Sequence, residues 1–265
     1  MILKKLSALI LALAIIFSFA SCGEKKTAET EESSNSEISG ESQVAEVDDV
    51  SKAYSAHQKL GTSMQQGGEY EADIKMIQES SQGKSETTGL MKIKTVDGKE
   101  QVYMEMDADI TGQKAKMIMV TDGTTAYYEV NGQKIEIDMT QFMDQVDQST
   151  VTPDFQKEAI KSCEIIPEGS DTRYKIVLNG ELMTDLLDQL KKEIEAVAGG
   201  SAFEIAISDV TYDILLDKKD EPKSMVLDMT YKITAGENSD EIKSKFELIF
   251  KSFSDVKIDL SKLSA

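Results

Sequence analysis

The sequence has 265 residues, and its 48 acidic residues outnumber 29 basic ones to give a formal net charge of −19. Such a surface repels phosphate backbones and anionic headgroups, which excludes nucleic acid as a partner and a peripheral hold on anionic lipid. Hydrophobic residues make up 40% of the chain, and a chain of this length can bury one sizeable core.

The first 21 residues have the pattern of an export signal. Lys4 and Lys5 precede an almost unbroken apolar run over residues 6–20. That run is shorter than the ~20 residues that a helix needs to cross a bilayer. A positive start, a short apolar stretch and small residues before a cleavage point predict a signal peptide rather than a spanning helix. We expect residues 1–21 to be removed.

A lipid attachment site is predicted directly after the signal. Residues 19–23 read Phe-Ala-Ser-Cys-Gly, which resembles the lipobox of bacterial lipoproteins. The resemblance implies that Cys22 receives a diacylglyceryl group and becomes the first residue of the mature chain. Two or more acyl chains anchor a protein stably, so we expect attachment to the extracytoplasmic face of the cell membrane. Cys163 then has no partner for an intrachain disulfide.

The lipidated cysteine begins a polar segment, residues 22–46, which is acidic and rich in serine with almost no apolar side chains. Such a composition cannot bury a core and predicts a disordered tether. As a flexible coil its ends would lie roughly 27 Å apart. The tether would therefore hold the following domain, residues 47–265, clear of the headgroups.

The domain is predicted to begin with a helix over residues 47–64, where Val50, Tyr54 and His57 recur at the three- and four-residue spacing of one helix face. A β-region follows. Apolar and polar residues alternate over Tyr70–Met76, as they do in the later segments, and this predicts antiparallel strands with one buried face. Asp-Gly and Asn-Gly pairs mark hairpin turns at residues 97–98, 122–123 and 131–132.

The second half mixes helices and strands. Helical pieces are predicted over residues 142–146 and 153–160, the second with Pro153 at its first position. The clearest apolar stripe at helical spacing covers residues 183–197. Further strands are predicted at residues 163–166, 174–178, 210–216, 225–233 and 242–250, with 256–260 as an extension of the last.

This element order predicts the α+β class, with a single strongly curved antiparallel sheet, an unclosed half-barrel, and helices packed on its concave face. The order is similar to that of the LolA-like superfamily of envelope lipoproteins and carriers, which includes lipid-binding mycobacterial relatives (LppX/LprG-like). It resembles more closely the DUF6612-type lipoproteins of Gram-positive bacteria. The resemblance lies in the element order and in a long hairpin at residues 210–229, without a residue-level motif. It implies an inner sheet face that holds acyl chains, with helices as a lid.

Methionine is the residue type that stands out, with thirteen in the sequence and no tryptophan. Many fall at alternating strand positions, where they would share one face. Methionine is flexible and polarizable, and suits surfaces that accommodate varied apolar ligands. The alternative is that it fills gaps in a core packed against helices. The candidate ligand-binding residues are Met76, Met91, Met104, Met106, Met117, Met119, Leu187, Leu190, Met225 and Met229.

Catalytic and metal-binding patterns are weak. His57 is the only histidine and lies on the apolar stripe of the first helix, so any nucleophile–histidine pair would depend on it. One histidine and one thiol cannot supply the four ligands of zinc. Residues 107–112 mimic the start of a calcium loop, but Ile118 stands where the bidentate glutamate is needed. We expect no enzyme activity, no bound metal and no cofactor.

Together these features predict a membrane-anchored lipoprotein that binds a lipid or another apolar small molecule in envelope transport or assembly. The alternative is a non-enzymatic interaction or structural module of the cell envelope, with a packed core. Such a module would meet an envelope protein through its acidic outer face or through Tyr103 and Tyr128.

Overall fold

The computed structural model describes residues 47–66, 68–81, 83–110, 112–134, 155–183, 204–235 and 238–264. Its α-helix α2 spans Val47–Gln66, as the sequence predicts. The strands are β1 (Glu69–Ser80), β2 (Gly83–Val96), β3 (Lys99–Ile110), β4 (Gln113–Thr121), β5 (Ala126–Val130), β6 (Gln133–Lys134), β7 (Ile160–Glu168), β8 (Asp171–Leu178), β9 (Glu204–Ile207), β10 (Val210–Leu216), β11 (Pro222–Ala235) and β12 (Asn238–Ser252). Three short 3₁₀ helices are η1 (Lys157–Ala159), η2 (Gly180–Leu182) and η3 (Ser261–Ser264).

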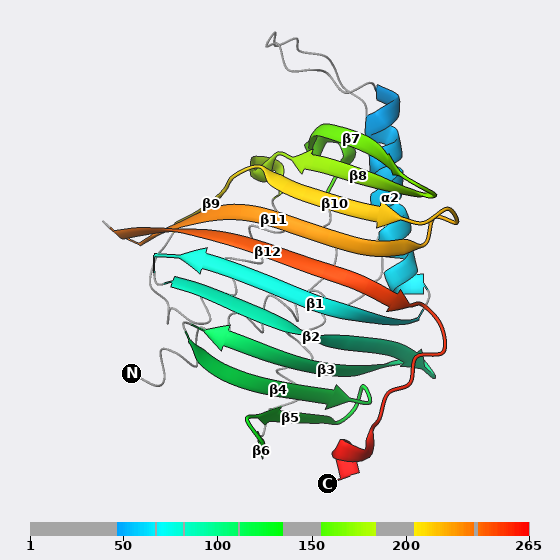
Figure 1. Cartoon of the computed structure of the whole chain (residues 1–265), viewed down its shortest axis with the longest axis vertical. Coiled ribbons are helices and arrows are strands. Elements are labelled where there is room, and N and C mark those ends of the chain that lie inside the picture. The colour runs from blue at the N-terminus through cyan, green and yellow to red at the C-terminus, as the bar shows by residue number, and fades with distance from the viewer. Residues whose placement is uncertain are drawn as a thin grey trace.

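All twelve strands belong to one antiparallel sheet (Figure 1). Their order is β6-β5-β4-β3-β2-β1-β12-β11-β10-β8-β7, and β9 pairs with β11. The first and last long strands therefore lie side by side in the middle of the sheet. Two predicted hairpin turns are confirmed, because Asp97-Gly98 and Asn131-Gly132 each place two successive residues at positive φ, as tight turns between antiparallel strands require.

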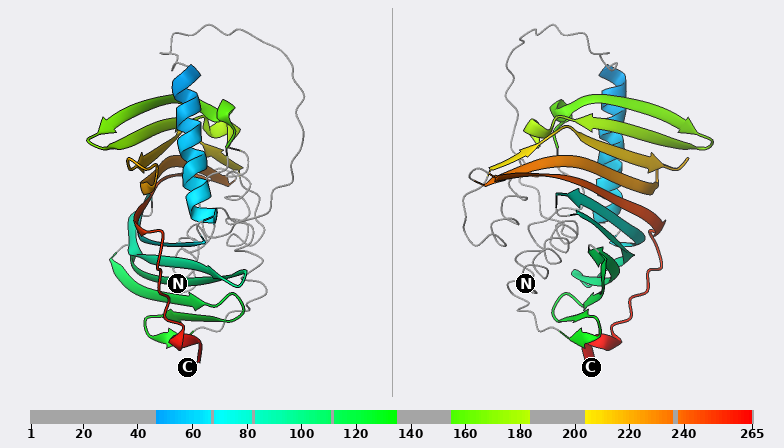
Figure 2. Two further views of the ribbon diagram at one scale, coloured as in Figure 1. Left: turned by 90° about the vertical axis from the view of Figure 1, so that its right-hand side faces the viewer. Right: turned by 60° about the vertical axis from the view of Figure 1, so that its left-hand side comes forward.

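The described part of the chain is mostly β rather than α+β. Its sheet is open and twisted, with β6 and β7 as its two edges (Figure 2). The prediction of a strongly curved half-barrel is therefore corrected. Alternation along a strand shows only that one face is buried, and it is equally compatible with a twisted open sheet and with a curled one.

Of the three helices predicted after α2, one falls partly within the described residues and two fall almost entirely outside them. The described part of the helix expected over residues 153–160 holds only the single 3₁₀ turn η1, after which Ile160 begins β7 opposite Leu178. The prediction of a helix there is wrong, because Ile160 and the residues after it form hydrogen bonds with β8 as strand β7. The helix expected over 142–146 lies outside the described residues. So does the one expected over 183–197, except that Met183 is buried just after η2.

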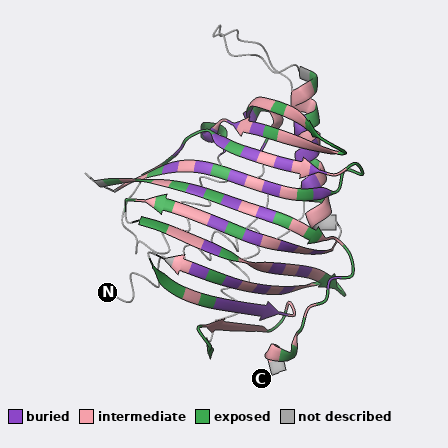
Figure 3. Ribbon diagram, in the orientation of Figure 1, coloured by how far each residue is buried: buried purple, intermediate pink, exposed green. Residues whose placement is uncertain are grey.

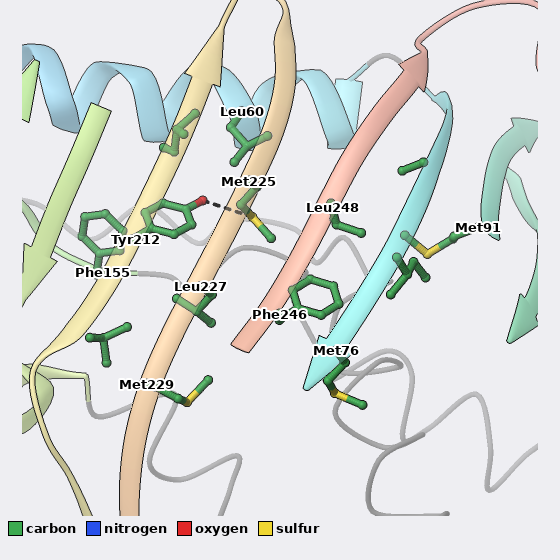
Figure 4. Packing of buried hydrophobic residues seen from close by; sticks show 14 of the residues in the cluster. Leu60, Met76, Met91, Phe155, Tyr212, Met225, Leu227, Met229, Phe246 and Leu248 are labelled. Atoms are coloured by element: carbon green, nitrogen blue, oxygen red, sulfur yellow. Dashed lines mark hydrogen bonds between the residues drawn. The ribbon is translucent and has the colours of Figure 1, made fainter. Parts of the chain in front are cut away.

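The core lies on one face of the sheet, and buried residues alternate with less buried ones along strands such as β1 and β10 (Figure 3). Helix α2 packs on this inner face against β7, β8, β10 and β11. Its contact residues Ala53 and Ala56 are small, and Leu60 reaches the sheet beside Met225 (Figure 4). Small side chains allow a helix backbone to lie close to a sheet, so the β7–β11 half of the core is built around α2.

The end of the chain covers the opposite, outer face. Beyond Ser252 the chain turns at Asp255, which has a φ of 57°, and residues 255–264 run to η3, which contacts β4 and β5. We name residues 255–264 the C-terminal strap. The strand expected over 256–260 is therefore wrong. The strap explains why Ile118 and Val120, which point to the outer face of β4, are also buried.

Specific contacts hold the C-terminal strap in place. The Asp255 amide donates to Glu69 Oε1 at 2.8 Å, and Lys94 Nζ donates to the Val256 carbonyl at 3.3 Å. Lys262 Nζ lies 2.9 Å from Glu129 Oε2 and 5.0 Å from the centre of the Tyr127 ring. The strap thus bridges strands from β1 to β5.

Removing the strap from Val256 onward should loosen one end of the sheet. Ile118 and Val120 would then meet solvent, and the local opening free energy of β4 and β5 would fall. Hydrogen exchange of backbone amides should accelerate in β4 and β5 and stay unchanged in β10 and β11, which serve as the internal control. Equal acceleration in all four strands would show that the strap supports the whole fold instead.

Candidate functional site

Strand pairing brings methionines from neighbouring strands next to one another on the inner face. Met91 of β2 lies opposite Met104 of β3, and Met104 lies opposite Met119 of β4. One row along, Met106 lies opposite Met117. Residues directly opposite each other have Cβ atoms about 4.5–5.5 Å apart. These five side chains therefore form two adjacent rows across three strands.

The remaining methionines of the candidate site lie on the same face. Met76 is opposite Phe246 in β12, and Met225 and Met229 are opposite Leu248 and Ser244 (Figure 4). The prediction that the eight strand methionines share one face is confirmed, and each is at most 4% exposed. Leu187 and Leu190 lie outside the described residues. We name the β1–β4 set the methionine face: Met76, Met91, Met104, Met106, Met117 and Met119.

A glycine that sequence reasoning missed shapes this face. Gly89 of β2 lies opposite Met106, and a Cβ at this position would overlap the Glu105 carbonyl oxygen and lie 2.9 Å from Met106 Cγ. Only glycine allows β3 to approach so closely and Met106 to lie over β2. An isolated glycine inside an alternating strand is the signal that marks such a close approach.

An aromatic cluster lies under α2 at the other half of the inner face. The His57 ring stacks on Phe155 with centroids 4.2 Å apart and meets Tyr212 edge-on at 5.7 Å. His57 is only 7% exposed, and its Nδ1 has no hydrogen-bond partner. Burial lowers the pKa of His57 to about 4, so the ring is neutral at pH 7. Its surroundings are those of a packing residue.

Few polar groups interrupt the inner face. Tyr212 donates a hydrogen bond to Met225 Sδ at 3.5 Å, which joins the aromatic cluster to the methionines (Figure 4). The Tyr70 hydroxyl is buried without a hydrogen-bond partner, beside Phe250 and Phe253. Burial raises the pKa of both tyrosines well above their usual range. With His57 Nδ1, the Tyr70 hydroxyl is a polar group to which a bound molecule could still hydrogen-bond.

The outer face carries the charges and a different tyrosine pair from the one predicted. Tyr103 and Tyr127 both lie opposite Val120 on the outer face. Tyr128 instead lies opposite Met119 on the inner face, where burial raises its pKa to about 12. The prediction that Tyr128 is exposed is wrong. Two adjacent tyrosines leave the alternation ambiguous, and only the pairing with β4 decides which one points inward.

Ion pairs stabilise the charged outer face. Lys92 lies 3.0 Å from Glu71, and Lys116 lies 2.5 Å from Glu105, which also accepts a hydrogen bond from Tyr103 at 2.5 Å. Hydrogen bonds from Lys116 and Tyr103 hold the pKa of Glu105 below its usual range. These acids are paired with neighbours, and their arrangement is that of a solvated sheet surface.

Groups with metal-binding or reactive potential are sparse. Across the described ranges, no three or more His, Cys, Asp or Glu side chains are grouped so that they would hold a metal ion. The free Cys163 is half-buried on β7, and burial raises the pKa of its thiol. No helix among the residues that the structure describes is long and apolar enough to cross a membrane.

Comparison with known proteins gives structural similarity only. No protein-family model and no curated protein sequence matches the chain. A DUF1329 family protein from Desulfovibrio piger is 11% identical with a TM-score of 0.31, over 81% of this chain and 98% of that one. A domain described as an outer membrane lipoprotein-sorting protein domain, from Vibrio parahaemolyticus, is 9% identical with a TM-score of 0.23, over 81% and 95%. MucB in complex with MucA(peri) is 6% identical with a TM-score of 0.14, over 80% and 96%.

Similarity at this level does not assign an activity or a ligand to this chain. Membership of the LolA-like superfamily, which the element order predicts, therefore stays a prediction. The chain is structurally similar to a DUF1329 protein and to a lipoprotein-sorting domain.

Proposed function

We propose that this protein is an extracytoplasmic lipoprotein, tethered through Cys22 and residues 22–46, that binds a lipid or another apolar ligand in envelope transport or assembly. It acts by binding and not as an enzyme, and it needs no cofactor for this role. The observation that supports the proposal is the methionine face. Five flexible, polarizable side chains of β2, β3 and β4 form two adjacent rows, and Met76 of β1 lies on the same face opposite Thr87.

The driving force would be apolar burial. Each methylene of a ligand that leaves water contributes about 0.8 kcal/mol, and methionine rotamers adjust to ligands of different shape. Because the face is at most 4% exposed, a ligand reaches it by displacing protein groups that pack there. The binding free energy is then the favourable packing of the ligand less the cost of displacing those groups. The Tyr70 hydroxyl, which lies on β1 opposite Ile93 of β2, would orient a polar headgroup.

A second candidate is a non-enzymatic interaction module of the envelope, and the same burial favours it. A face already removed from solvent needs no ligand to be stable. In that case the functional surface is the outer face, where Tyr103, Tyr127 and the C-terminal strap lie together.

A photoactivatable fatty acid distinguishes the two candidates. The mature chain with Cys22→Ser, which needs no detergent, is purified and examined by native mass spectrometry for a bound lipid. It is then incubated with the probe, irradiated and digested. We expect attachment on the inner-face positions of β1–β4, suppressed by excess unlabelled fatty acid. Absence of uptake, or attachment around outer-face Ile249 that competition does not suppress, would favour the interaction module.

A further inference from the structure

We propose that four residues of the methionine face form a binding site for a soft monovalent metal ion, Cu(I), with Ag(I) as its surrogate. The residues are Met104 and Met106 on β3 and Met117 and Met119 on β4. This site goes beyond the proposed function, because it needs only these side chains and no apolar ligand.

The strand register sets the geometry. Met104 lies opposite Met119 and Met106 lies opposite Met117, so the four Cβ atoms mark the corners of a rectangle on one face. Its sides measure roughly 5 Å across the strands and about 7 Å along them. Each sulfur is two bonds beyond Cβ on a side chain with three rotatable bonds. Met106 extends over Gly89 of β2 in this structure, so its side chain has to rotate toward β4 for all four sulfurs to gather over the centre of the rectangle.

The ligand chemistry selects the ion. Soft thioethers favour Cu(I), whereas imidazole, thiolate and carboxylate sites suit the commoner divalent ions. His57 lies under α2 against Phe155 and Tyr212. Cys163 is on β7, at the opposite edge of the sheet from β3 and β4. Neither contributes to the rectangle, so the set of ligands is neutral sulfur and does not match zinc or Cu(II).

The groups around the four methionines reduce the cost of holding the positive charge of the metal ion. Neutral thioethers leave the full positive charge on the ion, and holding a charge in apolar surroundings is costly. Tyr128 lies opposite Met119 and so places an aromatic ring beside the rectangle, and such rings attract cations. Met91, opposite Met104, adds a fifth thioether at the rim. The net charge of −19 raises the local concentration of cations.

The test is a titration with Ag(I) of the mature chain carrying Cys22→Ser and Cys163→Ser, because thiols would bind the ion themselves. Native mass spectrometry should show one Ag(I) per chain, and calorimetry should give its affinity. Competition for Cu(I) against bathocuproine disulfonate under reducing conditions should give the same stoichiometry. The paired change Met104→Leu and Met117→Leu keeps side-chain volume and should weaken Ag(I) binding at least about 100-fold.

The matched control changes Met225→Leu and Met229→Leu, which are equally buried on β11 and should leave Ag(I) binding unchanged. In the parent chain labelled with ¹³C-methyl methionine, the resonances of Met104, Met106, Met117 and Met119 should shift on Ag(I) addition. This measurement does not depend on how the variants fold. Absence of Ag(I) binding, shifts confined to other methionines, or equal loss in the β11 control would overturn the proposal.

Fatty-acid uptake separates this site from the proposed function. Uptake of the fatty-acid probe is therefore measured on the parent chain alone, and fatty-acid uptake in a parent chain that binds no Ag(I) would overturn the metal site and leave the proposed function standing. Ag(I) binding in a parent chain that takes up no fatty acid would refute the proposed function and leave the metal site standing.

Discussion

Replacing Gly89 by alanine should destabilise the protein by about 3 kcal/mol, the upper part of the range for overpacked cores. The added Cβ would overlap the Glu105 carbonyl oxygen and lie 3.0 Å from Met106 Cα. Both are backbone atoms, so relief requires β2 and β3 to separate where they pair. Equilibrium urea unfolding followed by circular dichroism measures the loss, and the Met106 methyl resonance reports the displaced side chain.

Gly132→Ala is the matched control. Gly132 has a φ of 79°, and a Cβ added there would have no heavy atom within 4 Å, so alanine meets only the left-handed backbone penalty of roughly 1–2 kcal/mol. A loss for Gly89→Ala no larger than that for Gly132→Ala would contradict the close approach of β2 and β3.

Acid should weaken the fold through His57. Burial lowers its pKa from 6.5 to about 4. Between pH 6.5 and pH 4, His57 is therefore protonated in the unfolded chain and neutral in the folded chain. The stability present above pH 6.5 is lost as the pH falls towards 4. One pKa unit corresponds to about 1.36 kcal/mol, so the loss is roughly 3 kcal/mol. Urea unfolding at neutral pH and near the lower end of this window measures it.

His57→Phe isolates this contribution. Phenylalanine keeps the stack on Phe155 and the edge-on contact with Tyr212, and it removes a nitrogen that has no hydrogen-bond partner. The variant should be at least as stable at pH 7 and should lose much less stability on acidification. Carboxylates such as Glu105, whose pKa is lowered by its partners, still contribute an acid-dependent part below their usual pKa. An unchanged pH dependence in His57→Phe would assign the whole effect to those carboxylates.

Local sequence patterns determined much of the secondary structure. The helical spacing from Val47 and the alternation over Tyr70–Met76 correspond to α2 and β1, and Asp97-Gly98 forms its predicted turn. These features depend on residues near in sequence, whose side-chain period and turn chemistry act over a few positions. The shared face of the strand methionines follows from the same period of two.

Pairing between distant segments decided the candidate site. The order Met91, Met104, Met119 across three strands depends on the registers of two hairpins, as does the inward side of Tyr128. A period of two is the same for either register and for an open or a curled sheet, so neither was predictable from the pattern. Gly89 matters only because Glu105 lies against it.

The C-terminal strap has the residue spacing of a strand but does not form one. Val256, Ile258 and Leu260 alternate with polar residues as a strand does. Pairing with β1 reaches only to Ser252, opposite Glu71, and pairing with β11 ends at Ile249. The chain beyond has no strand beside it and packs on the outer face instead. The sequence by itself determined which residues are apolar and at what spacing, and only the tertiary structure decided what they pack against, because partners for backbone hydrogen bonds and buried side chains come from distant segments.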